Sequence, residues 1–299
     1  LSPNDNELVN RVRNDGDSLM VDYPHAGHGK AITGVINTIA PGASVQHVRI
    51  NERSGLATEV SATRGMASSL RTLKRWDYPD LMINAFATAA CDVDTANPLA
   101  GVLQPIGLEV VVEVVDRFDP HLPDGMLIVA SAGNFASTRP HYPAAFDTVV
   151  GVGALDGNID SDGSPWSSPS KNAPVADFSN RGPWVDVYGI GVDLPTPHVD
   201  GVRFAHPNDP SCDPADCIID GFARWDGTSS AAPKVAALIA EVMTAGGLDA
   251  RDALGVLISA GARPLPQCGT ATRPTGVAIV LPSLEADITD PATAPEQTC

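Results

Sequence analysis

Short apolar runs alternate along this chain with segments whose apolar residues recur every three or four positions. Compact apolar runs are typical of strands that are covered on both faces, as in a parallel sheet. The alternation therefore predicts an α/β fold with a mainly parallel sheet. The four runs expected to form strands are Ser44–Ile50, Leu81–Asn84, Met126–Ser131 and Thr148–Val152.

Two of the intervening segments have a clear helical period, and we expect each to pack its apolar face against the sheet. Pro41 and Pro79 each stand between a helical run and a strand, where a proline ends a helix without breaking a ladder. The apolar residues that repeat are Val60, Ala67, Leu70 and Leu73 in the first segment and Leu108, Val111, Val115 and Phe118 in the second.

The charge balance excludes some partners. The chain has 36 acidic and 19 basic residues, a formal net charge of −17, and contains no basic stripe. A phosphate backbone repels so acidic a protein, so we expect no nucleic-acid partner. The longest apolar stretches, Val110–Val115 and Met126–Ala132, are far shorter than the roughly 20 residues that cross a bilayer, so we expect no membrane span.

Neither the cysteines nor the acidic loop predicts a metal site. None of the five cysteines has the Cys-x-x-Cys spacing of a zinc site, and Cys212 and Cys217 are either bridged or free thiols in a loop. Asp156, Asn158, Asp160, Asp162 and Gly163 alternate like the start of a calcium loop. Pro169, however, stands where the bidentate glutamate belongs, which favours a solvated turn.

A serine lies in the segment Gly227-Thr228-Ser229-Ser230-Ala231-Ala232-Pro233, just before the alanine-rich run Val235–Met243. Small neighbours would expose the Ser229 hydroxyl at the amino end of a buried helix, where free amides favour developing negative charge. In isolation, the simpler interpretation is that Thr228 or Ser229 caps the helix. Two further segments favour a nucleophile.

The first of these segments carries His28 between Gly27 and Gly29, at the start of a helical run. An imidazole titrates near neutral pH, which suits it to take a proton from a serine hydroxyl. The second carries Asn134, just beyond the strand Met126–Ser131. Ligand sites in parallel sheets lie at that end of the strands, and an asparagine amide can donate to an oxyanion. Alone, Gly133-Asn134 would be interpreted as a turn.

Together, the blocks His-Gly-x-x-x-x-Gly, Ser-Ala-Gly-Asn and Gly-Thr-Ser-x-Ala-x-Pro resemble those of the subtilisin-like serine peptidases, in the same order. The resemblance runs from about residue 1 to about Leu257 and includes the landmark Phe178–Gly182. It implies a three-layer subtilisin-like α/β fold and serine endopeptidase chemistry through an acyl-enzyme. Ser229 would be the nucleophile, His28 the general base, and Asn134 with the Ser229 amide the oxyanion donors.

The resemblance also implies where a substrate binds, although the sequence departs from the family there. The family usually has Ser-Leu-Gly-Gly where this chain has Ala85-Phe86-Ala87-Thr88, which changes the expected shape of the primary pocket. Lys30 replaces the usual threonine after the histidine block, and Gly189-Ile190-Gly191 replaces Ala-Pro-Gly. The implied substrate-binding residues are Ala85, Phe86, Ala87, Ser131, Ala132 and Gly133.

The family's third catalytic residue, an aspartate, normally lies about thirty residues before the histidine. Only 27 residues precede His28, and none of their aspartates follows an apolar strand in an Asp-x-Gly context. We therefore expect the acid and its strand, the first of the fold, to precede Leu1, so that the chain folds poorly alone and is inactive or crippled. The aspartates present are Asp5, Asp15, Asp17 and Asp22.

By family analogy we expect polypeptide substrates, a monomer, no cofactor other than an optional calcium ion, and an extracellular or cell-envelope location. The chain begins at Leu1 without a signal-peptide pattern. Residues 1–285 would form the peptidase domain, incomplete at its N-terminus, and residues 286–299 a tail. The alternative is a non-catalytic domain of the same fold that binds peptide or is structural. Carboxyl-serine peptidases, which use a glutamate base, fit less well because of His28 and Asn134.

Overall fold

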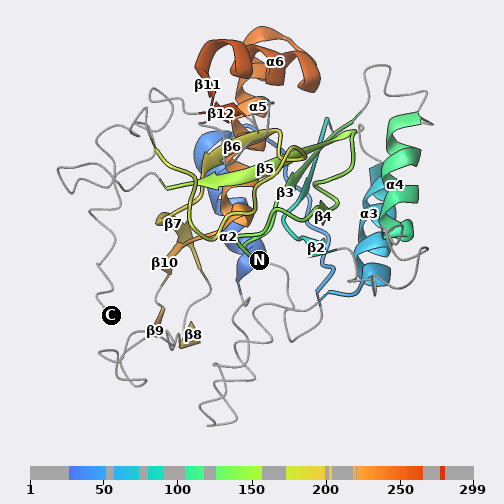
Figure 1. Ribbon diagram of the computed structural model, residues 1–299, viewed down its shortest axis with the longest axis horizontal. Helices are drawn as coiled ribbons and strands as arrows, with labels where there is room; N and C mark the ends of the chain where they lie inside the picture. The colour runs from blue at the N-terminus through green and yellow to red at the C-terminus, as the bar shows by residue number, and fades with distance from the viewer. Residues whose placement is uncertain are drawn as a thin grey trace, which may run out of the picture.

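A six-stranded sheet forms the centre of the structure, a computed structural model (Figure 1). The four pairs from β1 across to β12 are parallel, and β11 and β12 form an antiparallel hairpin at one edge. In order across the sheet, the strands are β1 (Leu81–Asn84), β3 (Leu127–Ser131), β5 (Val149–Leu155), β6 (Val187–Ile190), β12 (Val277–Ile279) and β11 (Ala262–Pro264). The structure describes residues 27–51, 57–73, 80–89, 105–117, 126–156, 173–198, 202–203, 218–219, 221–264 and 277–279.

Helices cover both faces of the sheet, which gives three layers. One face carries α3 (Glu59–Leu73) and α4 (Ile106–Arg117). The other carries α2 (His28–Ile39), α5 (Thr228–Gly246) and α6 (Ala250–Gly261). Three small two-stranded sheets complete the described part: β2 (Thr88–Ala89) with β4 (His141–Tyr142), β7 (Leu194–Pro197) with β10 (Phe222–Trp225), and β8 (Val202–Arg203) with β9 (Ile218–Ile219).

Strand β3 shows why the apolar runs are nearly continuous. All five of its residues are buried. Leu127 and Val129 pack in the core on the α2 and α5 side, whereas Ile128 and Ala130 pack in the core under α3 and α4. Because both faces of the strand are covered, neither set of alternating residues needs to be polar. The three-layer α/β arrangement is therefore the one predicted.

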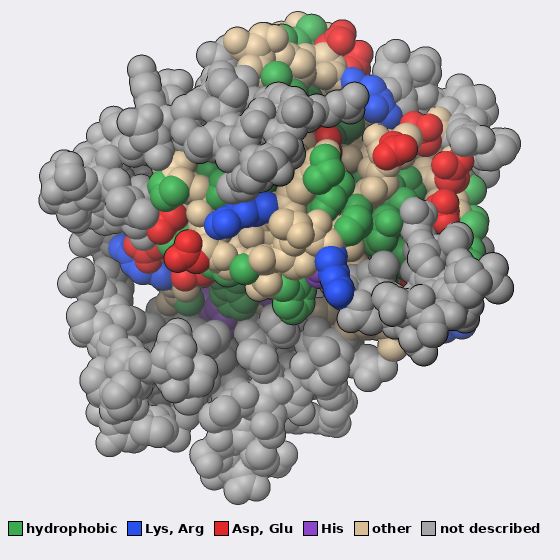
Figure 2. All heavy atoms as spheres, in the orientation of Figure 1, with side chains coloured by type: hydrophobic (Ala, Val, Ile, Leu, Met, Phe, Trp, Pro, Cys, Tyr) green, Lys and Arg blue, Asp and Glu red, His purple; other side chains and the backbone are tan. Residues whose placement is uncertain are grey.

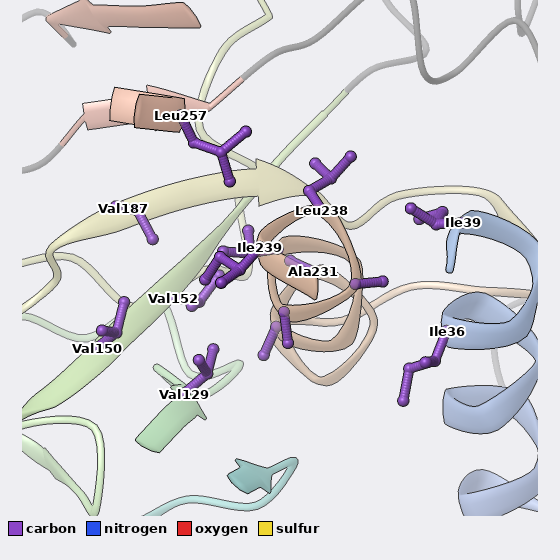
Figure 3. Packing of buried hydrophobic residues seen from close by; sticks show 14 of the residues in the cluster. Ile36, Ile39, Val129, Val150, Val152, Val187, Ala231, Leu238, Ile239 and Leu257 are labelled. Atoms are coloured by element: carbon purple, nitrogen blue, oxygen red, sulfur yellow. The ribbon is translucent and has the colours of Figure 1, made fainter. Parts of the chain in front are cut away.

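Helix α5 is the central element of the larger core. Figure 3 shows its Ile239 pointing toward Val152 and Val187 of the sheet, with Ile36 of α2 on the opposite side. Ile239 is fully buried, and burial of such a side chain contributes about 1.5–3 kcal/mol. Alanines on the same helix allow the close approach of both neighbours. The helix is thus held on two sides, and its amino end, which carries Ser229, is fixed with it.

Most of the predicted elements are confirmed, with two corrections. The segment Ser44–Ile50 is not a strand: no described strand pairs with it, and a strand exists only through its ladder of hydrogen bonds. Val60 was also wrongly placed on the buried face of its helix, since it is 59% exposed while Ala62 and Met66 are buried. The pairing of β11 with β12 was not predicted.

Several expectations lie outside the described residues. They include the five cysteines, the acidic loop beyond Asp156, Pro79, Phe118, the four candidate aspartates and the tail 286–299. Among the described residues, no group of three or more His, Cys, Asp or Glu side chains is arranged to hold a metal ion. Within the same ranges no single helix is long and apolar enough to cross a membrane, and α5 with α6 meets that test only as a pair bent by 102°.

Candidate active site

The candidate site lies at the carboxyl end of the central strands. β1 and β3 are parallel neighbours, with Asn84 paired to Ala130, so the segments that follow them emerge at the same edge of the sheet. The amino end of α5 reaches that edge as well, because the Gly133 N–H donates to Thr228 Oγ1 at 3.0 Å. This is where ligand sites form in parallel α/β sheets.

The side chain of Asn134 is held in one orientation by Thr228. Asn134 Oδ1 accepts two hydrogen bonds, one from the Thr228 N–H at 2.9 Å and one from Thr228 Oγ1 at 2.8 Å. Because the backbone N–H is a donor, the atom facing it must be the amide oxygen, which identifies the other side-chain atom as the NH₂ group. That NH₂ group is left to donate elsewhere.

Three groups converge on one point beside Gly227. A Cβ built on Gly227 would lie 3.0 Å from Ser229 Oγ, 3.3 Å from Asn134 Nδ2 and 3.5 Å from the Ser229 backbone nitrogen. Glycine leaves that point unoccupied by a side chain. The Ser229 N–H lies in the first turn of α5 and makes no hydrogen bond to another described residue. The three groups therefore line one space beside Gly227, and an oxygen that enters this space at contact distance from the Gly227 Cα would face a hydroxyl and two N–H donors.

His28 is the first residue of α2 and follows Gly27, whose φ of 81° lies in the left-handed region that favours glycine. The His28 ring lies against Trp225, with centroids 5.4 Å apart and planes tilted by 42°. Trp225 stands four residues before Ser229. Ser229 Oγ makes no hydrogen bond to a described residue, and catalytic hydrogen bonds are often long without substrate. The structure thus brings Asn134 to Ser229 and places His28 beside Trp225, at the end of the strand that precedes the candidate nucleophile.

Trp225 belongs to a wall that supports His28. The Trp225 ring also stacks on His198, with centroids 5.7 Å apart, and His198 is fully buried. Lys30, the departure from the family's threonine, donates from Nζ to the His198 carbonyl at 2.5 Å and so ties α2 to the pair Trp225 and His198.

In Figure 2, acidic and basic side chains lie side by side over β7 and β10, where Arg224 pairs with Asp193.

The two predicted substrate-binding segments face one another. A Cβ built on Gly133 would lie 3.4 Å from Ala87 Cβ and 3.4 Å from His141 Cδ2. Phe86 packs with the core under α3 and α4, so this bulky departure from the family sequence is directed into the core. Ser131 and Ala132 are buried, and Ser131 Oγ donates to the Asn84 carbonyl at 3.5 Å. The segments therefore offer mainly their backbones to a ligand.

Sequence reasoning gave no role to Trp225, His141 or Asn180, which all lie around the site. Asn180 stands inside the landmark Phe178–Gly182, and its place in that family-like segment was the signal that could have drawn attention to it. Trp225 lies two residues before Gly227, so its closeness to the nucleophile block was also visible. No local pattern pointed to His141.

One carboxyl group with a shifted pKa lies away from the site. Burial raises the pKa of Asp186 above its ordinary value. The hydrogen bond from the Gly151 N–H to Oδ2, at 2.8 Å, opposes this shift, and the charge of Asp147 adds to it. Asp186 directly precedes β6, at the amino ends of the parallel strands. Asp186 therefore lies at the opposite end of the parallel strands from Asn134.

Comparison with known proteins agrees with this geometry. Residues 2–248 match the subtilase family. The chain is 32% identical over 122 residues to a thermophilic serine proteinase of Bacillus sp. (strain AK1), covering 41% of this chain and 22% of that protein. It is 28% identical over 178 residues to thermitase of Thermoactinomyces vulgaris, covering 57% of this chain and 53% of thermitase. The chain thus spans about half or less of the length of these relatives.

Solved structures show the same fold at low sequence identity. A lanthipeptide protease superposes with a TM-score of 0.59 at 18% identity, covering 87% of this chain and 74% of the other. A cold-adapted subtilisin-like serine proteinase superposes with a TM-score of 0.55, also at 18% identity, covering 85% and 74%. At this identity the likeness establishes the shared fold.

Proposed function

The chain belongs to the subtilase family, and from that premise we propose that it is a serine endopeptidase acting through an acyl-enzyme. Ser229 is the nucleophile, His28 the general base, and Asn134 Nδ2 with the Ser229 N–H the oxyanion donors. The observation that carries this proposal is the point beside Gly227, within 3.5 Å of Ser229 Oγ, Asn134 Nδ2 and the Ser229 nitrogen.

The proposed reaction has two halves. Ser229 Oγ attacks the peptide carbonyl carbon while its proton passes to His28, and the carbonyl oxygen becomes an anion held by the two N–H donors. The intermediate collapses as His28 gives the proton to the leaving amine, which leaves an ester on Ser229. A water molecule, deprotonated by His28, then attacks the ester, and the acid product leaves with Ser229 restored.

The substrate is a polypeptide bound in extended form between the segments Ala85–Ala87 and Ser131–Gly133. Both segments lie at the carboxyl edge of the sheet beside the nucleophile, and the Cβ position of Gly133 lies 3.4 Å from Ala87 Cβ. A backbone-lined site suits an extended peptide, because main-chain hydrogen bonds do not depend on substrate sequence. We propose no metal or cofactor role in the chemistry.

Labelling by a fluorophosphonate probe tests the proposal directly. The folded wild-type chain is expected to be labelled at Ser229, and Ser229→Ala is expected to abolish labelling. Ser230→Ala is the matched control. Ser230 is only 5% exposed, too buried to react with the probe, so its replacement should leave labelling intact. Absence of labelling in well-folded wild-type protein would contradict the proposal and favour the alternative, a non-catalytic domain of this fold that binds peptide.

In the proposed mechanism a third residue, an acid, would orient His28. Residues before His28 offer no aspartate in the family's Asp-x-Gly context, so we propose that turnover by this 299-residue chain is low. In subtilisin, loss of the triad acid alone lowers kcat by about 3 × 10⁴. Each of Asp5, Asp15, Asp17 and Asp22 should therefore tolerate substitution by asparagine without a further large loss of labelling rate.

We also propose that the protein acts as a monomer outside the cytosol, in the medium or the cell envelope, where an endopeptidase does not meet the cell's own soluble proteins. Fractionation of the source cells, with detection by antibody, tests the location. Recovery of the protein in the cytosolic fraction alone contradicts it.

A further inference from the structure

Asn180 is fully buried and directs all of its side-chain hydrogen bonds at the segment that carries Asn134. Its Oδ1 accepts from the N–H groups of Phe135 and Ser137, each at 3.0 Å. Its Nδ2 donates to the Ala132 carbonyl at 2.8 Å. In addition, its backbone N–H donates to the Gly133 carbonyl at 2.9 Å.

These bonds fall on both sides of Asn134. Two of them hold residues 132 and 133 before it, and two hold residues 135 and 137 after it, so the peptide planes that flank its Cα are held in place. The orientation of those planes sets the direction in which the Asn134 side chain leaves the backbone. A change at Asn180 therefore moves Asn134 Nδ2 relative to the point beside Gly227, although Asn180 itself does not reach that point.

Gly133 shows how closely the two segments fit. Its φ is 101°, in the region that favours glycine, and a Cβ on it would come within 2.6 Å of Asn180 Nδ2. The Asn180 amide thus fills the space that a side chain at residue 133 would need. The buried Asn180 amide therefore requires a glycine at residue 133, directly before Asn134.

We propose that Asn180 is a positioning residue for the oxyanion donor: it holds the segment 132–137 so that Asn134 Nδ2 faces Ser229 Oγ. This inference rests on the proposed peptidase function. Thr228 acts on the Asn134 side chain itself, whereas Asn180 acts on the backbone that carries it. Other bonds keep the segment attached when Asn180 is changed, because the Arg181 N–H donates to the Ser137 carbonyl and the Ala136 N–H to the Phe178 carbonyl.

The test measures kcat and KM of Asn180→Ala on a chromogenic peptide ester, with the enzyme concentration set by titration of the active serine. We expect kcat to fall about 10- to 100-fold, less than or equal to the loss of an oxyanion donor itself. KM should stay within about twofold, because ground-state binding does not use the oxyanion site. Leu257→Ala, in the core of α6 far along the chain from the site, is the destabilised control and should leave kcat per titrated site unchanged.

A double variant separates positioning from a general structural role. In an Asn134→Ala background the donor is absent, so adding Asn180→Ala should change kcat by less than about threefold. If the two losses multiply, or if Leu257→Ala lowers kcat as much as Asn180→Ala does, the inference is wrong. Should Asn180→Ala not fold, Asn180→Asp replaces it, since the carboxylate keeps an acceptor for Phe135 and Ser137 and loses the donor to Ala132.

The outcomes also distinguish this inference from the proposed function. If folded wild-type protein neither labels with fluorophosphonate nor hydrolyses the ester, the peptidase assignment fails and the inference fails with it. If wild-type protein is active and Asn180→Ala has the same kcat, the peptidase assignment stands and the inference alone is overturned.

Discussion

The hydroxyl of Thr228 donates to Asn134 Oδ1 at 2.8 Å and accepts from the Gly133 N–H at 3.0 Å. Thr228 directly precedes the candidate nucleophile, and Asn134 lies 94 residues earlier in the chain. One buried side chain therefore joins the amino end of α5 to the segment after β3, with both of its hydrogen-bonding roles satisfied. The candidate nucleophile and the proposed oxyanion donor are held to each other through it.

Thr228→Val tests this link, because valine keeps the shape of threonine and removes the hydroxyl. We expect kcat to fall about tenfold or more, since the Asn134 amide keeps only the Thr228 N–H as a partner and can rotate away from Ser229. Steady-state kinetics on a chromogenic peptide provide the measurement. Thr228→Ser restores the hydroxyl and should recover most of the rate; a valine variant as active as wild type would show that the hydroxyl does not orient Asn134.

Gly227→Ala should obstruct the proposed oxyanion site. The φ of Gly227 is 160°, extended backbone that alanine also adopts, so the expected effect is on activity rather than folding. Its Cβ would lie 3.0 Å from Ser229 Oγ and 3.3 Å from Asn134 Nδ2, and would crowd a substrate oxygen bound between these two groups. We expect a loss of about 100-fold or more in kcat, comparable to removal of an oxyanion donor, with a nearly unchanged melting temperature.

Gly255→Ala is the control for this substitution. Gly255 lies in α6 with nothing within 4 Å of its Cβ position, so alanine should leave activity unchanged and stabilise the helix by about 0.5–1 kcal/mol. Thermal unfolding and peptide hydrolysis are measured for both variants. Full activity of Gly227→Ala would contradict the position assigned to the substrate oxygen.

The sequence predicted those parts of the fold and site that depend on local pattern. The apolar run Leu81–Asn84 forms β1 with the bounds expected, and the buried Leu108 and Val111 of α4 follow the predicted period. Ser229 and Asn134, each surrounded by small residues in a recognisable block, also lie close to one another. In each case, neighbours in sequence determine the local shape.

The features that were missed depend on partners far away in the chain. Asn180 bonds to residues 43 to 48 positions earlier, and its place in the landmark Phe178–Gly182 did not indicate these partners. The run Ser44–Ile50 has the composition of a strand, yet no described strand pairs with it. Val60 fits the helical period of its segment, but the packing of α3 buries Ala62 and Met66 instead. Composition thus predicts a candidate strand or helix, and the elements packed against it determine whether it forms and which of its residues are buried.

Gly34→Ala should lower activity indirectly, by displacing His28, the proposed general base. Gly34 lies on α2 six residues after His28, and a Cβ there would overlap the ring of Pro197 on β7. Overpacking of this kind costs about 1–3 kcal/mol, and relief by movement of α2 would shift His28 away from Trp225. We expect lower resistance to urea and a reduced kcat. Pro197→Ala removes the overlapping ring atoms, so the double variant should regain stability; no regain would show that the overlap is not the cause.

His141 limits the space beside the predicted substrate segment Ser131–Gly133. His141 is 4% exposed, and its ring stacks on Phe135, with centroids 5.3 Å apart, and on Trp184, at 6.2 Å. One ring edge, at Cδ2, lies 3.4 Å from the Cβ position of Gly133. In the proposed complex, the substrate residue that supplies the attacked carbonyl places its side chain next to this segment. We therefore expect the wild-type protein to prefer a small residue, such as alanine, before the scissile bond.

His141→Ala should shift that preference toward larger residues, because it removes the ring that fills the space. Peptides that differ only in alanine or phenylalanine before the scissile bond provide the measurement. The ratio of their kcat/KM values should move toward phenylalanine by about tenfold or more, in line with the 1–3 kcal/mol that a few carbon atoms contribute in a specificity pocket. Since both substrates meet the same enzyme sample, the ratio is insensitive to any loss of folded protein that the cavity causes. An unchanged ratio would show that the side chain of the substrate does not lie against His141.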